Sequence, residues 1–149
     1  MKAKVILPPT YFLLAIIAMV VLHFLVPIEG IVPVVWKLLG IFPLALGTIM
    51  NVVADRAFHR AGTTVRPCED SAQLVTDGLF KITRNPMYFG FVLMLIGIGL
   101  ILGSLTSFVI AALFAVLIDR KFIAVEEQML ADRFGERWQA YAETTRRWI

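Results

Sequence analysis

The stretch 87–118 contains no Asp, Glu, Lys or Arg. A helix that crosses the hydrocarbon core of a membrane needs about 20 apolar residues, so roughly thirty are too many for one crossing. Gly103 and Ser104 divide the stretch, and a Gly-Ser pair is typical of a turn. The stretch therefore predicts two short membrane helices, at about 87–102 and 104–118.

Two further apolar runs lie upstream, at about 9–26 and 33–54, and each is long enough to cross a membrane. Lys37, near the start of the second run, can extend its ammonium group to the membrane interface. The first run lacks a small-residue cleavage site, so we expect a retained helix and not a signal peptide. Charged residues make up only 17% of the chain, whereas a soluble domain has about a quarter. We therefore expect an all-α integral membrane protein, a single domain over residues 1–149 with about four transmembrane helices and a turn at 27–30.

The distribution of basic residues predicts the orientation. Apart from Lys37, every Lys and Arg lies in the first few residues, in the polar stretch 55–86 or in the tail 119–149. Basic loops stay on the cytoplasmic side, and an even number of crossings places all three segments there. We expect a cytosolic loop at 55–86, a cytosolic C-terminal helix in the tail, and cytosolic N- and C-termini. The expected location is the inner (cytoplasmic) membrane of a bacterium or archaeon.

Glycines recur within the predicted membrane helices. Those residues are Gly40, Gly47, Gly90, Gly97 and Gly99. Small residues let two helix backbones approach closely, which favours tight helix packing. The alternative for the last three is a smooth face that admits a flat ligand.

Several functional classes are not expected. The basic residues flank apolar runs and form no stripe, so nucleic-acid binding is not predicted. Cys68 is the only cysteine, and His23 and His59 are well separated in the chain. An internal disulfide and a metal site are therefore not expected.

The segment 83–90 joins the polar loop to the third apolar run. Pro86 suits the first turn of a helix, because the N–H that it lacks would be unpaired there. It also disfavours the α conformation at Asn85. This places Arg84 and Asn85 on a stiff loop at the mouth of a membrane helix, with Tyr88 just inside. The alternative is that Arg84 reaches lipid headgroups and Tyr88 belongs to an aromatic belt.

Two adjacent glutamates, Glu126 and Glu127, lie in the predicted tail helix. At about 100° per residue they fall on the flanks of an apolar stripe. The stripe consists of Ile123, Leu130 and Phe134. A carboxylate beside an apolar surface at the membrane edge requires a cation or donor. The cations predicted on this side are Arg84, Arg146 and Arg147. Together with Asn85 and Tyr88, such a cluster could bind a small zwitterionic cofactor, whereas a freely solvated helix surface is the alternative.

These residues, in this order, resemble the isoprenylcysteine carboxyl methyltransferase family and its phospholipid methyltransferase relatives. The likeness covers roughly residues 62–149, and three blocks carry it. The first block is residues 74–80 together with 83–90. The second is Glu126-Glu127, followed by Leu130, Phe134-Gly135 and Tyr141. The third is Arg147-Trp148-Ile149. One departure is Asn85, where the prenylcysteine enzymes usually carry His, and it weakens the inference of a prenylated substrate.

The resemblance implies a membrane-embedded methyltransferase that uses S-adenosylmethionine. By position, Arg84, Asn85 and Tyr88 would contact the methionine end of the cofactor. Leu74 and Val75 would form a wall for the adenine. These roles are implied by the resemblance alone.

The remaining charged residues would then have roles in catalysis. Glu126 and Glu127 would bind polar groups, and either could accept a proton from an amine acceptor. Arg147 could hold an acceptor carboxylate, or anchor the tail at the interface. The expected reaction is methyl transfer to a lipophilic or membrane-partitioned carboxylate, thiol or amine at the cytosolic face. The alternatives are a non-catalytic membrane module or a small transporter-like protein on the same scaffold.

Overall fold

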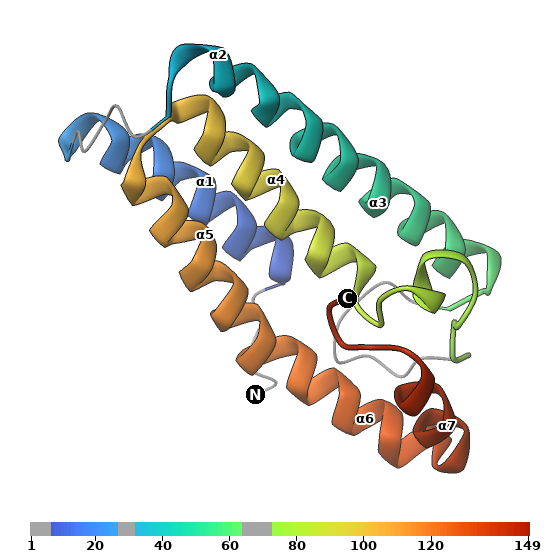
Figure 1. The fold of residues 1–149 in the computed structure, drawn as a ribbon. Coiled ribbons are helices and arrows are strands. Elements are labelled where there is room, and N and C mark those ends of the chain that lie inside the picture. Colours follow the sequence, from blue (N-terminus) through green and yellow to red (C-terminus); the bar gives the residue numbers. More distant parts are fainter. Residues whose placement is uncertain (1–6, 27–31, 64–72) are drawn as a thin grey trace.

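The computed structural model describes residues 7–26, 32–63 and 73–149, and within these residues all regular structure is helical. The long helices are α1 (Pro8–Leu25), α3 (Ile41–Arg60), α4 (Pro86–Leu102) and α5 (Leu105–Ile118). They alternate in direction, so that the first turns of α1 and α4 and the last turns of α3 and α5 lie toward one end of the bundle (Figure 1). Helix α4 contacts the other three. The predicted turn at 27–30, the loop residues 64–72 and the first six residues lie outside the described part of the chain.

Helices α1, α4 and α5 begin and end within one residue of their predicted bounds. Asn85 precedes α4 with φ −129° and ψ 57°, outside the α region, and Pro86 is the first residue of the helix. Gly103 ends α4 in the left-handed conformation, at φ +71°. The Nζ of Lys37 donates to the carbonyl of Leu102 at this same end, 3.4 Å away.

The second predicted membrane helix begins within one residue of its prediction, but it is interrupted near its start and extends beyond its predicted end. It begins as the short helix α2 (Val34–Lys37), passes through a 3-10 turn, η1 (Leu38–Gly40), and continues as α3 to Arg60. The 3-10 turn lies immediately upstream of Pro43, which has no N–H to complete an α-helical bond to the preceding turn. The charge of residues 55–60 predicts that they belong to the polar loop, and this prediction is wrong. They extend the helix with a polar last turn and a half, in which His59 lies 3.4 Å from the Asp55 carboxylate.

Glycine packing joins α3 to α4, as predicted. A Cβ at Gly97 would lie 2.6 Å from the carbonyl oxygen of Gly40, and one at Gly90 would lie 2.8 Å from that of Gly47. Such distances leave no room for a side chain, so the two backbones are in direct contact. A flat ligand is thus excluded from Gly90 and Gly97. At Gly99 a Cβ would meet only the Phe108 ring, at an ordinary 3.4 Å.

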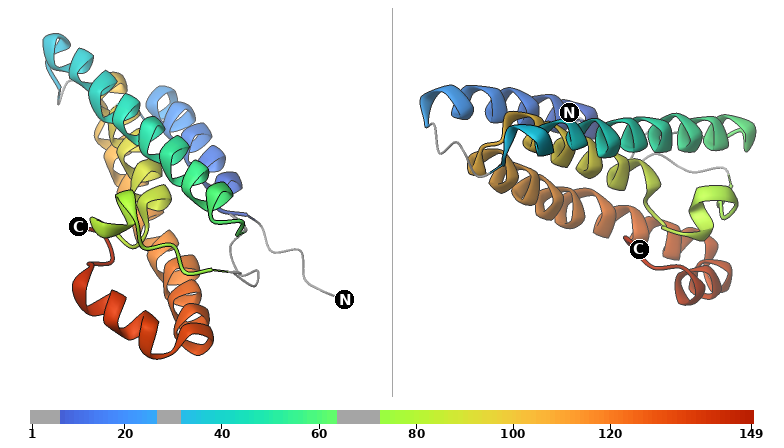
Figure 2. Two further views of the ribbon diagram at one scale, coloured as in Figure 1. Left: turned by 90° about the vertical axis from the view of Figure 1, so that its right-hand side faces the viewer. Right: turned by 45° about the horizontal axis from the view of Figure 1, so that its top comes forward.

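Helix α5 does not stop at the predicted membrane boundary. It continues through a π-helical turn, η3 (Asp119–Ile123), into α6 (Ala124–Phe134). Gly135, at φ +52°, ends α6 as its position predicts, and α7 (Glu136–Thr144) then folds back (Figure 2).

A second hydrophobic core fixes α7 against the end of α3 and the short 3-10 helix η2 (Gly78–Lys81). Its buried members are Ala54, Phe80, Trp138 and Tyr141. The Tyr141 hydroxyl donates to the carbonyl of Phe80 at 2.6 Å. Burial raises the pKa of Tyr141 to about 12, so the hydroxyl keeps its proton. This core positions the loop before α4 and the tail beside one another.

In the part of the chain that the structure describes, two helices are long and apolar enough to cross a membrane, Pro8–Leu25 and Val34–Arg60. Large apolar side chains are exposed along both, and along α5. These surfaces support membrane association.

Candidate functional site

The site is built around the N-terminus of α4. Thr83 and Asn85 are both buried there, and the Asn85 N–H donates to the Thr83 hydroxyl at 3.1 Å. This local bond, from a backbone N–H to a hydroxyl two residues earlier, holds Asn85 outside the α conformation. The loop therefore presents Arg84 and the first turn of α4 toward α6.

Tyr88 meets the first of the two glutamates. Its hydroxyl donates to Oε1 of Glu126 at 2.6 Å, and the tyrosine ring is buried in the main hydrophobic core. Burial raises the pKa of Glu126 to about 7, an effect that the Tyr88 hydrogen bond opposes and the neighbouring Glu127 reinforces. Glu126 is thus a carboxyl group that changes protonation state near neutral pH.

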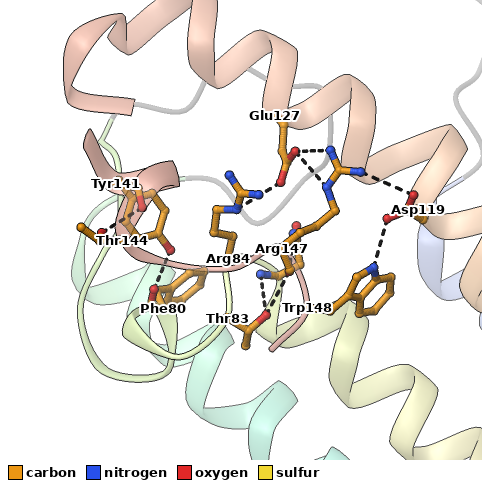
Figure 3. A network of polar contacts seen from close by, with 10 residues as sticks. Phe80, Thr83, Arg84, Asp119, Glu127, Tyr141, Thr144, Arg147 and Trp148 are labelled. Carbon is orange, nitrogen blue, oxygen red and sulfur yellow. Dashed lines mark hydrogen bonds and ion pairs between the residues drawn. The ribbon is translucent and has the colours of Figure 1, made fainter. Parts of the chain in front are cut away.

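Glu127 lies between two arginines from distant parts of the chain (Figure 3). Its Oε1 lies 3.4 Å from Nε of Arg84, and its Oε2 accepts bonds from Arg147 at 2.6 Å and 3.0 Å. The Glu127 and Arg84 side chains are only 13% and 14% exposed. Arg84 also lies over the Trp138 ring, 5.6 Å from its centroid. The hydrogen bonds to Glu127 raise the pKa of Arg147, so its guanidinium group stays charged throughout the physiological range.

Residues 145–148 cross the loop before α4 and are bonded to it. The Arg84 N–H donates to the Arg146 carbonyl at 3.0 Å. The Thr83 hydroxyl and the Asn85 side-chain amide both donate to the Arg147 carbonyl, at 3.2 Å and 3.0 Å. The structure therefore shows the Asn85 amide bound to the tail backbone.

The structure brings six predicted residues together and leaves two apart. Those together are Arg84, Asn85, Tyr88, Glu126, Glu127 and Arg147. Leu74 and Val75 instead pack against the second core and line a cavity of about 410 Å³ at the end of α3. Neither Glu126 nor Glu127 lines that cavity. The charged side chains of this cluster are paired with one another, so a ligand that entered it would have to break some of these ion pairs.

Sequence reasoning missed Thr83 and Asp119. Thr83 is 1% exposed and holds Asn85. Asp119 accepts a bond from the indole N–H of Trp148 at 3.1 Å and lies 3.5 Å from Arg147. A carboxylate at the end of an uncharged membrane run requires a partner, and that signal could have identified Asp119.

The arrangement suits binding of a small molecule that carries both charges. Guanidinium groups bind carboxylates, and carboxylates bind ammonium groups or hydroxyls. Within the described residues, no group of three or more His, Cys, Asp or Glu could hold a metal ion.

The raised pKa of Glu126 predicts how stability changes with pH. The folded state holds this proton up to about pH 7, whereas an unfolded glutamate releases it near 4.5. The folded protein thus binds more protons between these values, and its stability falls as pH rises through them. We expect Glu126→Gln to gain roughly 2–3 kcal/mol relative to the natural protein between pH 5 and pH 8. Melting curves of both proteins in detergent at the two pH values test this, with Glu143→Gln as control. A difference that does not change with pH would contradict it.

Comparisons with known proteins identify methyltransferases as relatives of this chain. The phospholipid methyltransferase family matches residues 35–137. The protein-S-isoprenylcysteine O-methyltransferase B of Arabidopsis thaliana is 32% identical over 111 residues, which are 70% of this chain and 54% of the plant protein. Protein A of the same plant is 35% identical over 110 residues, with the same coverage, 70% and 54%.

A third relative is the protein-S-isoprenylcysteine O-methyltransferase of Schizosaccharomyces pombe. It is 35% identical over 71 residues, which are 46% of this chain and 29% of the yeast protein. The chain thus spans about half the length of the plant relatives, and these eukaryotic proteins give no support to a bacterial or archaeal source. Because the family match covers more than half of the chain, the chain belongs to the phospholipid methyltransferase family, as an isoprenylcysteine O-methyltransferase-like member.

Proposed function

We propose that this protein transfers a methyl group from S-adenosylmethionine to a lipophilic acceptor that reaches the site from the membrane. The observation that carries the proposal is the cluster at the mouth of α4, where Tyr88 binds Glu126 and two arginines bind Glu127. The names of the relatives support methyl transfer to oxygen on an isoprenylated cysteine. For this chain, the acceptor class remains a carboxylate, a thiol or an amine with an apolar tail.

The cluster fits the polar end of the methyl donor. Arg84 Nε and Glu127 Oε1 are buried and make no hydrogen bond within the described residues, although they lie only 3.4 Å apart. Each therefore lacks a hydrogen bond that the methyl donor could supply, although a ligand placed between the two atoms would have to separate this ion pair. We assign the donor's carboxylate to Arg84, and its ammonium and hydroxyl groups to Glu127 and Glu126. Asn85 and Tyr88 shape the same end, and we assign the adenine to the separate cavity that Leu74 and Val75 line.

The residues of the site also have tasks in the reaction. Bound S-adenosylmethionine supplies an electrophilic methyl group on a positively charged sulfur. A carboxylate or thiolate acceptor needs no base, so the protein would only align it and exclude water. An amine acceptor must lose a proton, and Glu126 is placed to accept it because its pKa is about 7. We propose that Arg147 holds an acceptor carboxylate when one is present.

We propose that α1, α3, α4 and α5 all cross the membrane, with the site on the cytosolic side. Helix α4 is apolar but short, at 17 residues, and α5 is shorter still before the π turn. Short spans are accommodated by local thinning of the bilayer. The alternating directions of the four helices place the site, the polar end of α3 and the tail at one end, where basic residues favour the cytosol (Figure 1).

Binding of labelled S-adenosylmethionine to the purified protein in detergent tests the proposal. We expect saturable binding, and we expect Tyr88→Phe to weaken it by about tenfold because a hydrogen bond to a charged or titrating group is lost. Tyr11→Phe is the matched control, since its hydroxyl accepts a bond from the Lys121 ammonium group and not from either glutamate. An absence of binding at millimolar donor, with the protein still folded, would refute the assignment and favour a non-catalytic module.

A further inference from the structure

Asp119 is the first residue of the π turn, at the point where the uncharged run ends. Its side chain is 21% exposed, and its two oxygens have different partners. Oδ1 accepts the indole N–H of Trp148 at 3.1 Å, and Oδ2 lies 3.5 Å from Nη1 of Arg147. Nε of Arg120 also lies 3.9 Å from Oδ2 of Asp119. Because the Arg120 side chain is 84% exposed, this ion pair contributes little to holding Asp119.

The π turn places Asp119 on the same face as Glu127. Eight residues of regular α-helix would rotate the two side chains about 80° apart. A π turn accommodates one extra residue, which reduces this to about 20°. The single guanidinium of Arg147 can then bind both carboxylates, at 2.6 Å to Glu127 and 3.5 Å to Asp119 (Figure 3).

These bonds also fix residues 145–148 over the loop before α4. The backbone of this segment accepts bonds from Arg84, Thr83 and Asn85. Its side chains, in contrast, are held from the opposite side by Asp119 and Glu127. Asp119 is thus the one helix residue that holds both Arg147 and Trp148 among the described contacts.

We propose that Asp119 is a positioning residue that orients Arg147 against Glu127 and keeps residues 145–148 across the donor site. The proposal rests on the proposed function, because it assigns Asp119 an effect on binding of the methyl donor. Asp119 acts through Arg147 and touches neither donor nor acceptor.

Asp119→Asn removes the charge and keeps an oxygen for Trp148. We expect it to weaken binding of S-adenosylmethionine by roughly three- to tenfold, the scale of a partly buried ion pair. In an Arg147→Gln background the same change should have less than about a twofold further effect, because coupled residues are not additive. Asp119→Glu should restore part of the affinity. Asp132→Asn, an exposed change on the same continuous helix, is the matched control.

Hydrogen–deuterium exchange measures the positioning itself and does not depend on the donor. In Asp119→Asn and in Trp148→Phe, we expect amide exchange in peptides covering residues 83–85 and 145–149 to be at least about tenfold faster than in the natural protein. Unchanged exchange would overturn the proposal, and so would an additive effect in the Arg147→Gln background. If the natural protein binds no donor, the proposed function fails, whereas the exchange result still decides whether Asp119 holds the segment.

Discussion

Gly97→Ala is expected to lower the melting temperature of the purified protein by about 5–10 °C, a loss of roughly 3 kcal/mol. The added methyl group would lie 2.6 Å from the Gly40 carbonyl oxygen and 2.8 Å from the Leu44 nitrogen. Both are backbone atoms of the opposing helix, so no side-chain rotation can relieve the contact. The helices must move apart, and the packing that positions α4 is lost along its length. Thermal unfolding in detergent, followed by circular dichroism, measures the change.

Gly99→Ala is the matched control for this prediction. The two glycines lie two residues apart on the same helix, but a Cβ at Gly99 meets only the edge of the Phe108 ring at 3.4 Å. Alanine is favoured over glycine in a helix by about 1 kcal/mol, so Gly99→Ala should leave the melting temperature unchanged or raise it. Equal melting temperatures for Gly97→Ala and Gly99→Ala would show that α3 and α4 do not pack as described.

The long helices were predictable because their cause is local. Apolar runs, a proline at the start of α4 and a glycine at its end determine where a helix begins and stops. The polar end of α3 was not predicted, because charged residues alone do not distinguish a loop from the exposed end of a helix. A helix that leaves the membrane continues for as long as its polar residues tolerate helical geometry, and residues 55–60 do.

The proximity of six residues in the candidate site was predictable, whereas the part played by Thr83 and Asp119 and the detailed geometry were not. The requirement that Glu126 and Glu127 find partners at a membrane edge correctly placed Tyr88, Arg84 and Arg147 near them. The π turn at Asp119 has no sequence signal, since an inserted residue changes the phase of a helix without altering its composition. The separation of Leu74 from the glutamates follows from packing between α3, η2 and α7, which no local pattern encodes.

Glu127→Ala is expected to weaken binding of S-adenosylmethionine by about 100-fold or more, equivalent to roughly 2.7 kcal/mol. Among the described residues, Glu127 is the one carboxylate that both Arg84 and Arg147 contact. Its removal leaves two positive groups close together in a largely buried place, without the anion that would bind the donor's ammonium group. The melting temperature should fall as well, because one partner of a buried pair has been removed. Equilibrium binding and melting curves on the same preparation measure both effects.

A double variant separates the loss of binding from the loss of stability. Removing both partners of a buried ion pair is often nearly neutral, whereas removing one is costly. We therefore expect Glu127→Met combined with Arg147→Met to regain part of the stability that Glu127→Met alone loses, since Arg84 still lacks its anion, but none of the donor affinity. Glu143→Gln, an exposed change on α7, should alter neither property. If the double variant binds the donor as tightly as the natural protein does, Glu127 serves only to neutralise the arginines, and the donor must bind elsewhere. If it is stable and does not bind, the carboxylate itself recognises the donor.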